Sequence, residues 1–100
     1  MKGNRVVVTG MGAVTPLGLD VSSSWEGICA GRSGAATITQ FDASAFTTRF
    51  SASVKDFSVE GYLETRDARR MDHFIQFGMV AGIQAFRDSG LEITEANSHR

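Results

Sequence analysis

The sequence has little of what several classes of protein require. It contains one cysteine, Cys29, and two histidines, His73 and His99. A single cysteine excludes an internal disulfide, and two isolated histidines do not supply the ligands of a structural metal site. We therefore expect no bound metal, and the low cysteine count is typical of a reducing compartment.

Long apolar runs and an excess of one charge are also missing. Residues 1–5 lead into only three consecutive valines, far fewer than the about 20 apolar residues that span a membrane. Ten basic side chains oppose eleven acidic ones, for a net charge of −1. This balance gives no global attraction for nucleic acid or for anionic lipid. We expect a cytoplasmic protein without a nucleic-acid or membrane partner, in which any charged partner is bound by a local patch.

The N-terminal part predicts a buried strand and then a loop. Residues 5–10 form a β-branched run without alternation, as in a strand that is covered on both faces. Residues 11–18 contain glycines and the only proline, and so predict a loop. Gly10 and Gly12 also begin a dinucleotide-binding pattern, but Thr15 occupies the position of its third glycine. We interpret the glycines as a tight turn.

A first helix is predicted after this loop. Asp20 or one of residues 22–24 is suited to cap its N-terminus, and Ser23 and Glu26 have the spacing of a capping box. Gly31 and Gly34 are suited to end the helix. Its apolar residues, which include a packing tryptophan, share one face: Val21, Trp25, Ile28 and Cys29.

A second, longer helix is predicted from Arg66 or Arg69 through Ser89, with Gly90 just beyond its end. Apolar side chains cover most of its circumference, which is typical of a buried helix. Two glycines one turn apart, residues 78 and 82, each cost about 1 kcal/mol of helix propensity relative to alanine. This cost indicates that another backbone packs closely there.

The stretch between the helices is less regular. Four phenylalanines recur in it without a helical period, residues 50–54 alternate weakly and predict a short strand, and residues 58–63 predict one or two helical turns. The whole inventory is therefore one fully buried strand, one short strand and two helices. Such a strand needs neighbouring strands, and a helix buried all round needs neighbours on every side. We expect residues 1–100 to form one segment of a larger α/β fold.

An ordered set of short motifs carries a family resemblance along the chain. It resembles the opening of the β-ketoacyl-[acyl-carrier-protein] synthases, the condensing enzymes of bacterial fatty acid synthesis. Residues 41–57 and 70–72 resemble the elongating type II enzyme more than the type I enzyme. Polyketide ketosynthases share the opening strand and loop and remain an alternative. The motifs are residues 5–12 (RVVVTGMG), 15–18 (TPLG), 30–34 (AGRSG), 41–42 (FD), 54–57 (VKDF), 69–72 (RRMD) and 88–91 (DSGL), together with Trp25.

The resemblance implies a thiolase-like fold of two layered α/β halves, a homodimer, and no cofactor. It implies a decarboxylative Claisen condensation of malonyl-carrier protein with an enzyme-bound acyl thioester. The family performs this reaction with a nucleophilic cysteine, two histidines and an oxyanion hole. In the family these groups lie beyond the residues that match this sequence, so the resemblance assigns no catalytic residue here.

Cys29 and His73 are interpreted as structural residues. Cys29 falls near the C-terminal end of the first helix, where the helix dipole disfavours the thiolate that a nucleophile needs. We therefore expect a packed thiol, since free cysteine usually behaves as a small hydrophobe. His73 begins a helix that is expected to be buried, and we interpret it as a core or interface histidine.

Arg66, Arg69 and Arg70 form the charged cluster to which we assign a function. They are spaced i, i+3 and i+4, and so lie on one side of a helix. A solvated face, neutralised by Glu64 and by two nearby aspartates, is the alternative. In the family, basic residues at these positions contact the acidic acyl carrier protein, and arginine is suited to bidentate pairing with carboxylates. Other functions left open are a non-catalytic carrier-binding scaffold module and a small nucleotide-binding domain.

Overall fold

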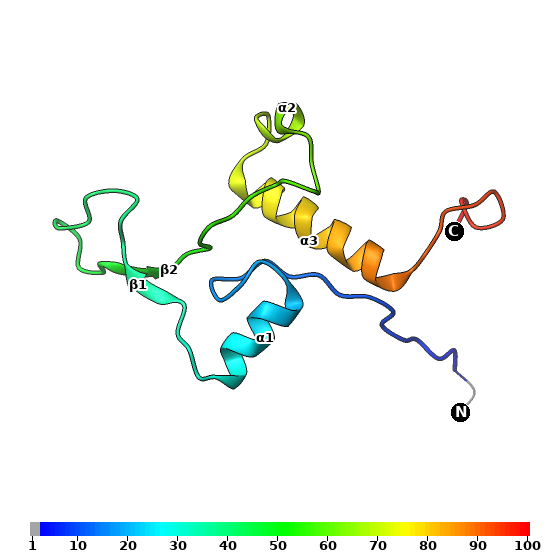
Figure 1. The fold of residues 1–100 in the computed structure, drawn as a ribbon, viewed down its shortest axis with the longest axis horizontal. Coiled ribbons are helices and arrows are strands. Elements are labelled where there is room, and N and C mark those ends of the chain that lie inside the picture. Colours follow the sequence, from blue (N-terminus) through cyan, green and yellow to red (C-terminus); the bar gives the residue numbers. More distant parts are fainter. Residues whose placement is uncertain (1–2) are drawn as a thin grey trace.

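The computed structural model describes residues 3–100. These residues have an open arrangement, with a radius of gyration of 17.8 Å and extents of 57 × 40 × 23 Å. A compact domain of this length would have a radius of gyration of about 13 Å. Figure 1 shows a hairpin at one end, a long helix across the middle, and both chain ends at the opposite side. In chain order the elements are α1 (Val21–Cys29), β1 (Ala35–Thr37), β2 (Phe50–Ala52), α2 (Thr65–Ala68) and α3 (His73–Ser89).

The strand predicted for residues 5–10 does not form within residues 3–100, where this segment is extended and unpaired. Val6 and Val8 are 91% and 79% exposed. A strand is defined by hydrogen bonds to a neighbour, and no other strand of the described chain lies beside this one. The β-branched run therefore keeps its extended backbone without a sheet to join.

The sheet consists of β1 and β2, which pair antiparallel with Ala36 opposite Ser51. The prediction of a short strand within residues 50–54 is confirmed over the first three of them. Its partner was not predicted, because the run Ala35–Thr37 has neither alternation nor a large β-branched content.

The first helix begins and ends where the sequence predicts. Asp20 is its N-cap and accepts a hydrogen bond from the backbone N–H of Ser23 at 2.8 Å. The hydroxyl of Ser23, and then its N–H, lower the pKa of the Asp20 carboxyl by stabilising the anion. The predicted capping box of Ser23 with Glu26 is wrong, because Ser23 lies inside the helix. Gly31 has a positive φ of 70° just after the helix, which only glycine adopts freely.

The buried side of α1 is not the apolar one. Ser24 and Gly27 are its buried residues, and they face the loop of residues 15–18. A Cβ on Gly27 would lie 3.1 Å from the Cβ of Leu17, so the small residues let the loop approach closely. Trp25 is 62% exposed, because no described residue covers the apolar face. The prediction that this tryptophan is packed is therefore wrong for residues 3–100.

The long helix predicted from residue 66 or 69 is two helices, α2 and α3 (Figure 1). Between them the chain tightens: the N–H groups of Arg70 and Met71 donate to carbonyls three residues back, as in a 3₁₀ turn. Asp72 then adopts an extended ψ of 161° and is the N-cap residue of α3, which begins at His73. The predicted end is confirmed, since Gly90 has the left-handed conformation of a helix stop.

Helix α3 is not buried all round by residues 3–100. Val80 is 1% exposed, whereas Phe74 is 72% exposed. At Gly78 and Gly82 an added Cβ would meet nothing within 4 Å, so the backbone expected there is not part of the described chain. No helix of this part of the chain has both the length and the apolar character needed to span a membrane.

Another segment does approach α3 closely, on a different face. A Cβ on Gly10 would overlap the carbonyl oxygen of Ala85, and one on Gly12 would overlap that of Ala81. The residues that follow each glycine also make hydrogen bonds to α3. The N–H of Met11 donates to Asp88 Oδ2 at 3.0 Å, and that of Ala13 donates to Gln84 Oε1 at 3.1 Å. The glycine pair therefore serves close packing, which accounts for the pattern without a nucleotide.

The 100-residue chain by itself should not fold cooperatively. Too few of its side chains are buried to balance the conformational entropy of ordering it, and its large apolar side chains remain in water. Thermal unfolding followed by circular dichroism should show a broad, shallow change, and size-exclusion chromatography should show association. A sharp melting transition from a monodisperse monomer would contradict this expectation.

Replacing Gly12 with alanine should damage the contact with α3. The new Cβ has to displace backbone atoms of α3, which close packing opposes by about 1–3 kcal/mol. In the complete protein the variant should lower the melting temperature by several degrees. Gly3→Ala is the matched control, since an added Cβ at Gly3 meets nothing within 4 Å. Equal melting temperatures for the two variants would show that the close approach does not stabilise the protein.

Candidate functional site

The three arginines lie together at the turn that joins α2 to α3 (Figure 1). Arg66 belongs to α2, Arg69 is its C-cap, and Arg70 follows. All three are exposed. The arginine turn, as we call residues 66–70, therefore presents three guanidinium groups to solvent from one short segment.

The backbone changes from α-helical to 3₁₀ hydrogen bonding between Arg69 and Arg70. The N–H of Arg69 donates to the carbonyl of Thr65, four residues back, as in an α-helix, whereas that of Arg70 donates to Asp67, three residues back. Residues three apart lie on the same side of such a turn, so Arg66 and Arg69 project together. Arg70 is rotated from Arg69 by roughly a third of a turn.

Acidic residues border the arginine turn. Glu64 occupies the N-cap position of α2, Asp67 lies within α2 and Asp72 occupies the N-cap position of α3, so these carboxylates equal the arginines in number. The guanidinium hydrogen bonds within residues 3–100 come from other arginines: Arg49 donates to the carbonyl of Phe46 and Arg87 to that of Gly61. Hydrogen bonding within the described chain therefore leaves the donors of the arginine turn open to a partner.

The half-buried side chain of Gln76, in the first turn of α3, makes hydrogen bonds to the backbone beside Arg69 and Arg70. Its Nε2 donates to the carbonyl oxygen of Ala68 at 2.8 Å and to that of Met71 at 3.3 Å. These two carbonyls flank Arg69 and Arg70. Reasoning from the sequence missed Gln76, although an amide between apolar neighbours in a helix is a signal that a buried polar partner exists.

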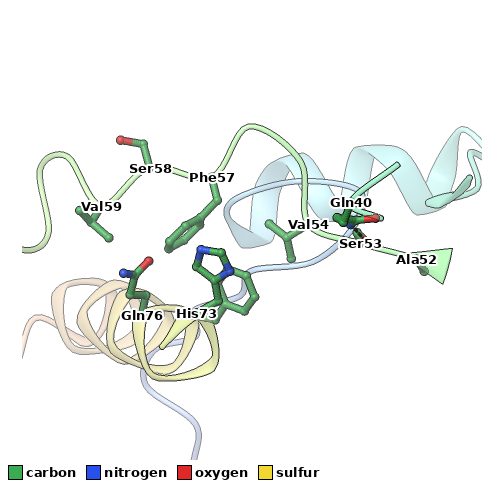
Figure 2. Close-up of a pocket in the computed structure, with 10 residues that line it drawn as sticks. Gln40, Ala52, Ser53, Val54, Phe57, Ser58, Val59, His73 and Gln76 are labelled. Carbon is green, nitrogen blue, oxygen red and sulfur yellow. Dashed lines mark hydrogen bonds between the residues drawn. The ribbon is translucent and has the colours of Figure 1, made fainter. Parts of the chain in front are cut away.

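An open pocket of about 760 Å³ lies between the start of α3 and the chain that follows β2. Figure 2 shows its aromatic side. The rings of Phe57 and Phe77 meet edge to face at 4.7 Å, and His73 stacks on Phe77 at 6.0 Å. His73 is exposed, so the described chain does not bury it as a core histidine, and its interpretation as an interface histidine stays a prediction. The lining residues are Gln40, Ala52, Ser53, Val54, Phe57, Ser58, Val59, His73, Gln76 and Phe77.

Cys29 is the last residue of α1 and is exposed. Its position at the C-terminal end of the helix is as predicted. The expectation of a packed thiol is wrong, because the side of α1 on which it lies is not covered by residues 3–100. The same residues contain no group of three or more side chains able to hold a metal ion.

Comparisons with known proteins identify relatives of this chain. Residues 3–100 match the family described as "Beta-ketoacyl synthase, N-terminal domain". The chain belongs to this family. Two relatives named 3-oxoacyl-[acyl-carrier-protein] synthase 2, from Vibrio harveyi and Vibrio cholerae, are 55% and 53% identical over the whole of this chain. The chain spans 24% of the length of each of these relatives, which is about a quarter.

A solved structure of this family shares the conformation of the chain. The ishigamide ketosynthase/chain length factor superposes with a TM-score of 0.72 and 32% sequence identity, over 86% of this chain and 21% of that one. The expected fold class is thereby confirmed: these residues are part of the thiolase-like α/β fold of the ketosynthases. The exposed apolar faces are thus found on a segment that matches about a fifth of a larger ketosynthase.

Proposed function

We propose that this chain functions as the N-terminal segment, residues 1–100, of an elongating β-ketoacyl-[acyl-carrier-protein] synthase. The observation that carries the proposal is 55% identity along the full chain to a relative named as such a synthase. The reaction is the decarboxylative Claisen condensation of malonyl-carrier protein with an acyl thioester. The lower identity of 32% to the ketosynthase/chain length factor favours the fatty-acid enzyme over a polyketide-type one. The proposal includes a cytoplasmic homodimer.

Within this synthase, the arginine turn binds the acyl carrier protein, loaded with acyl or malonyl groups. Exposure of Arg66, Arg69 and Arg70, and the absence of guanidinium hydrogen bonds from them to the described chain, support this role. Guanidinium groups pair with carboxylates in bidentate fashion, and clustered positive charge raises the rate at which an acidic partner is encountered. A carrier that docks here delivers its thioester to residues that this chain does not contain.

Reversing Arg69 and Arg70 to glutamate in the complete synthase should weaken docking. We expect the KM for carrier-bound substrate to rise by roughly tenfold, because two favourable charge contacts become repulsive. Its dependence on salt should flatten, since steering is screened once the Debye length falls to about 8 Å. The measurement is steady-state condensation at several ionic strengths.

The experiment has two controls, a pair of arginines outside the arginine turn and a carrier-free substrate. Reversal of Arg5 and Arg32, which are also exposed but lie outside the arginine turn, should leave the KM for carrier-bound substrate within about twofold. A small carrier-free thioester should be turned over equally by all variants. Equal losses on both substrates would mean that the arginines stabilise the fold, and the docking role would be wrong.

The 100-residue chain alone should show no condensing activity, and Cys29 should not be the nucleophile. Its place at the C-terminal end of α1 disfavours a thiolate. In the complete synthase Cys29→Ser should keep turnover near that of the wild type, and mass spectrometry should still find the acylated intermediate. Loss of that intermediate in the variant would place the nucleophile at Cys29 and refute this assignment.

A further inference from the structure

The arginine turn depends on a residue outside it for its shape. Helix α2 has only four residues, fewer than an isolated helix needs to be stable, and its last carbonyls lack partners within the helix. Ala68 is 5% exposed, so water has little access to this end of α2. The carbonyl oxygen of Ala68 accepts a hydrogen bond from the N–H of Met71 at 3.0 Å, and its second lone pair can take one further donor.

Gln76 supplies that donor. Its Nε2 lies 2.8 Å from the oxygen of Ala68 and 3.3 Å from that of Met71. The backbone of Gln76 is itself held by α3, because its N–H donates to the carbonyl of Asp72 at 3.1 Å. One amide on a 17-residue helix thus connects to the chain on both sides of Arg69 and Arg70.

We propose that Gln76 is a positioning residue for carrier-protein docking, acting through the arginine turn. This inference rests on the proposed function of that turn. With the Gln76 bonds intact, residues 69–71 keep one backbone arrangement, and the guanidinium groups are preorganised for an acidic partner. Without these bonds the turn samples other arrangements, and the partner has to order it on binding.

The test is Gln76→Met in the complete synthase, which keeps the length of the side chain and removes its donor. We expect the KM for carrier-bound substrate to rise about threefold to fivefold, as for the loss of one hydrogen bond from an ordered segment. The kcat, and the turnover of a small carrier-free thioester, should stay unchanged. Hydrogen exchange of the free enzyme should quicken at the amides of Arg70 and Met71.

Gln84→Met is the matched control on the same helix. Gln84 also makes hydrogen bonds through its amide, but with Ala13, Leu19 and Tyr62, all outside the arginine turn. We expect it to lower the melting temperature without changing the KM for carrier-bound substrate. Should Gln76→Met fail to fold, Gln76→Glu replaces it, because a carboxylate cannot donate to the oxygen of Ala68 and should raise the KM likewise.

A double-mutant comparison separates this inference from the proposed function. In a background in which all three arginines are alanine, Gln76→Met should cause no further rise in KM. The same rise in both backgrounds, or an unchanged KM when Gln76 alone is replaced, would overturn the positioning role. If the arginine variants themselves leave the KM unchanged, the docking function of the turn is refuted.

Discussion

The close contact between residues 10–13 and α3 is the constraint on which the rest of this structure depends. Gly10 and Gly12 bring the backbone so near to α3 that no Cβ fits. Two side chains of α3 accept hydrogen bonds from neighbouring N–H groups: Asp88 from Met11, and Gln84 from Ala13. Gln84 also donates to the carbonyl of Leu19, just before α1. The helix thereby holds the start of the chain and, through it, the loop on which α1 packs.

A second set of hydrogen bonds connects the hairpin to the loop before α1. The ammonium of Lys55 donates to three backbone carbonyls, those of Pro16, Gly34 and Ser53. They belong to the loop before α1, the segment before β1 and the segment after β2. A single charged group thus joins three stretches of the chain. In a segment with so few buried side chains, polar bonds to the backbone determine much of the arrangement, since each leaves a carbonyl satisfied.

The arginine turn shows how much of a site can be predicted from the spacing of its residues. The spacing of Arg66, Arg69 and Arg70 was sufficient to predict that they gather on one side of a helix. It was not sufficient to show that the helix ends at Ala68, where a tighter turn follows and the amide of Gln76 donates to the last carbonyl. Side-chain bonds between elements leave no periodic trace in a sequence, so the end of α2 appears only in three dimensions.

By itself the sequence determined the local features of this protein: the start of the first helix at Asp20 or just after it, the stops at Gly31 and Gly90, the second strand of the hairpin, and the family resemblance that the comparisons confirm. These depend on a few neighbouring residues, whose conformational preferences act at short range. Tertiary structure decided the rest. The valines of residues 6–8 favour a strand but pair with none here, and the exposure of Trp25 depends on what covers it. Burial and strand pairing are relations between distant segments, so only the packed arrangement determines them.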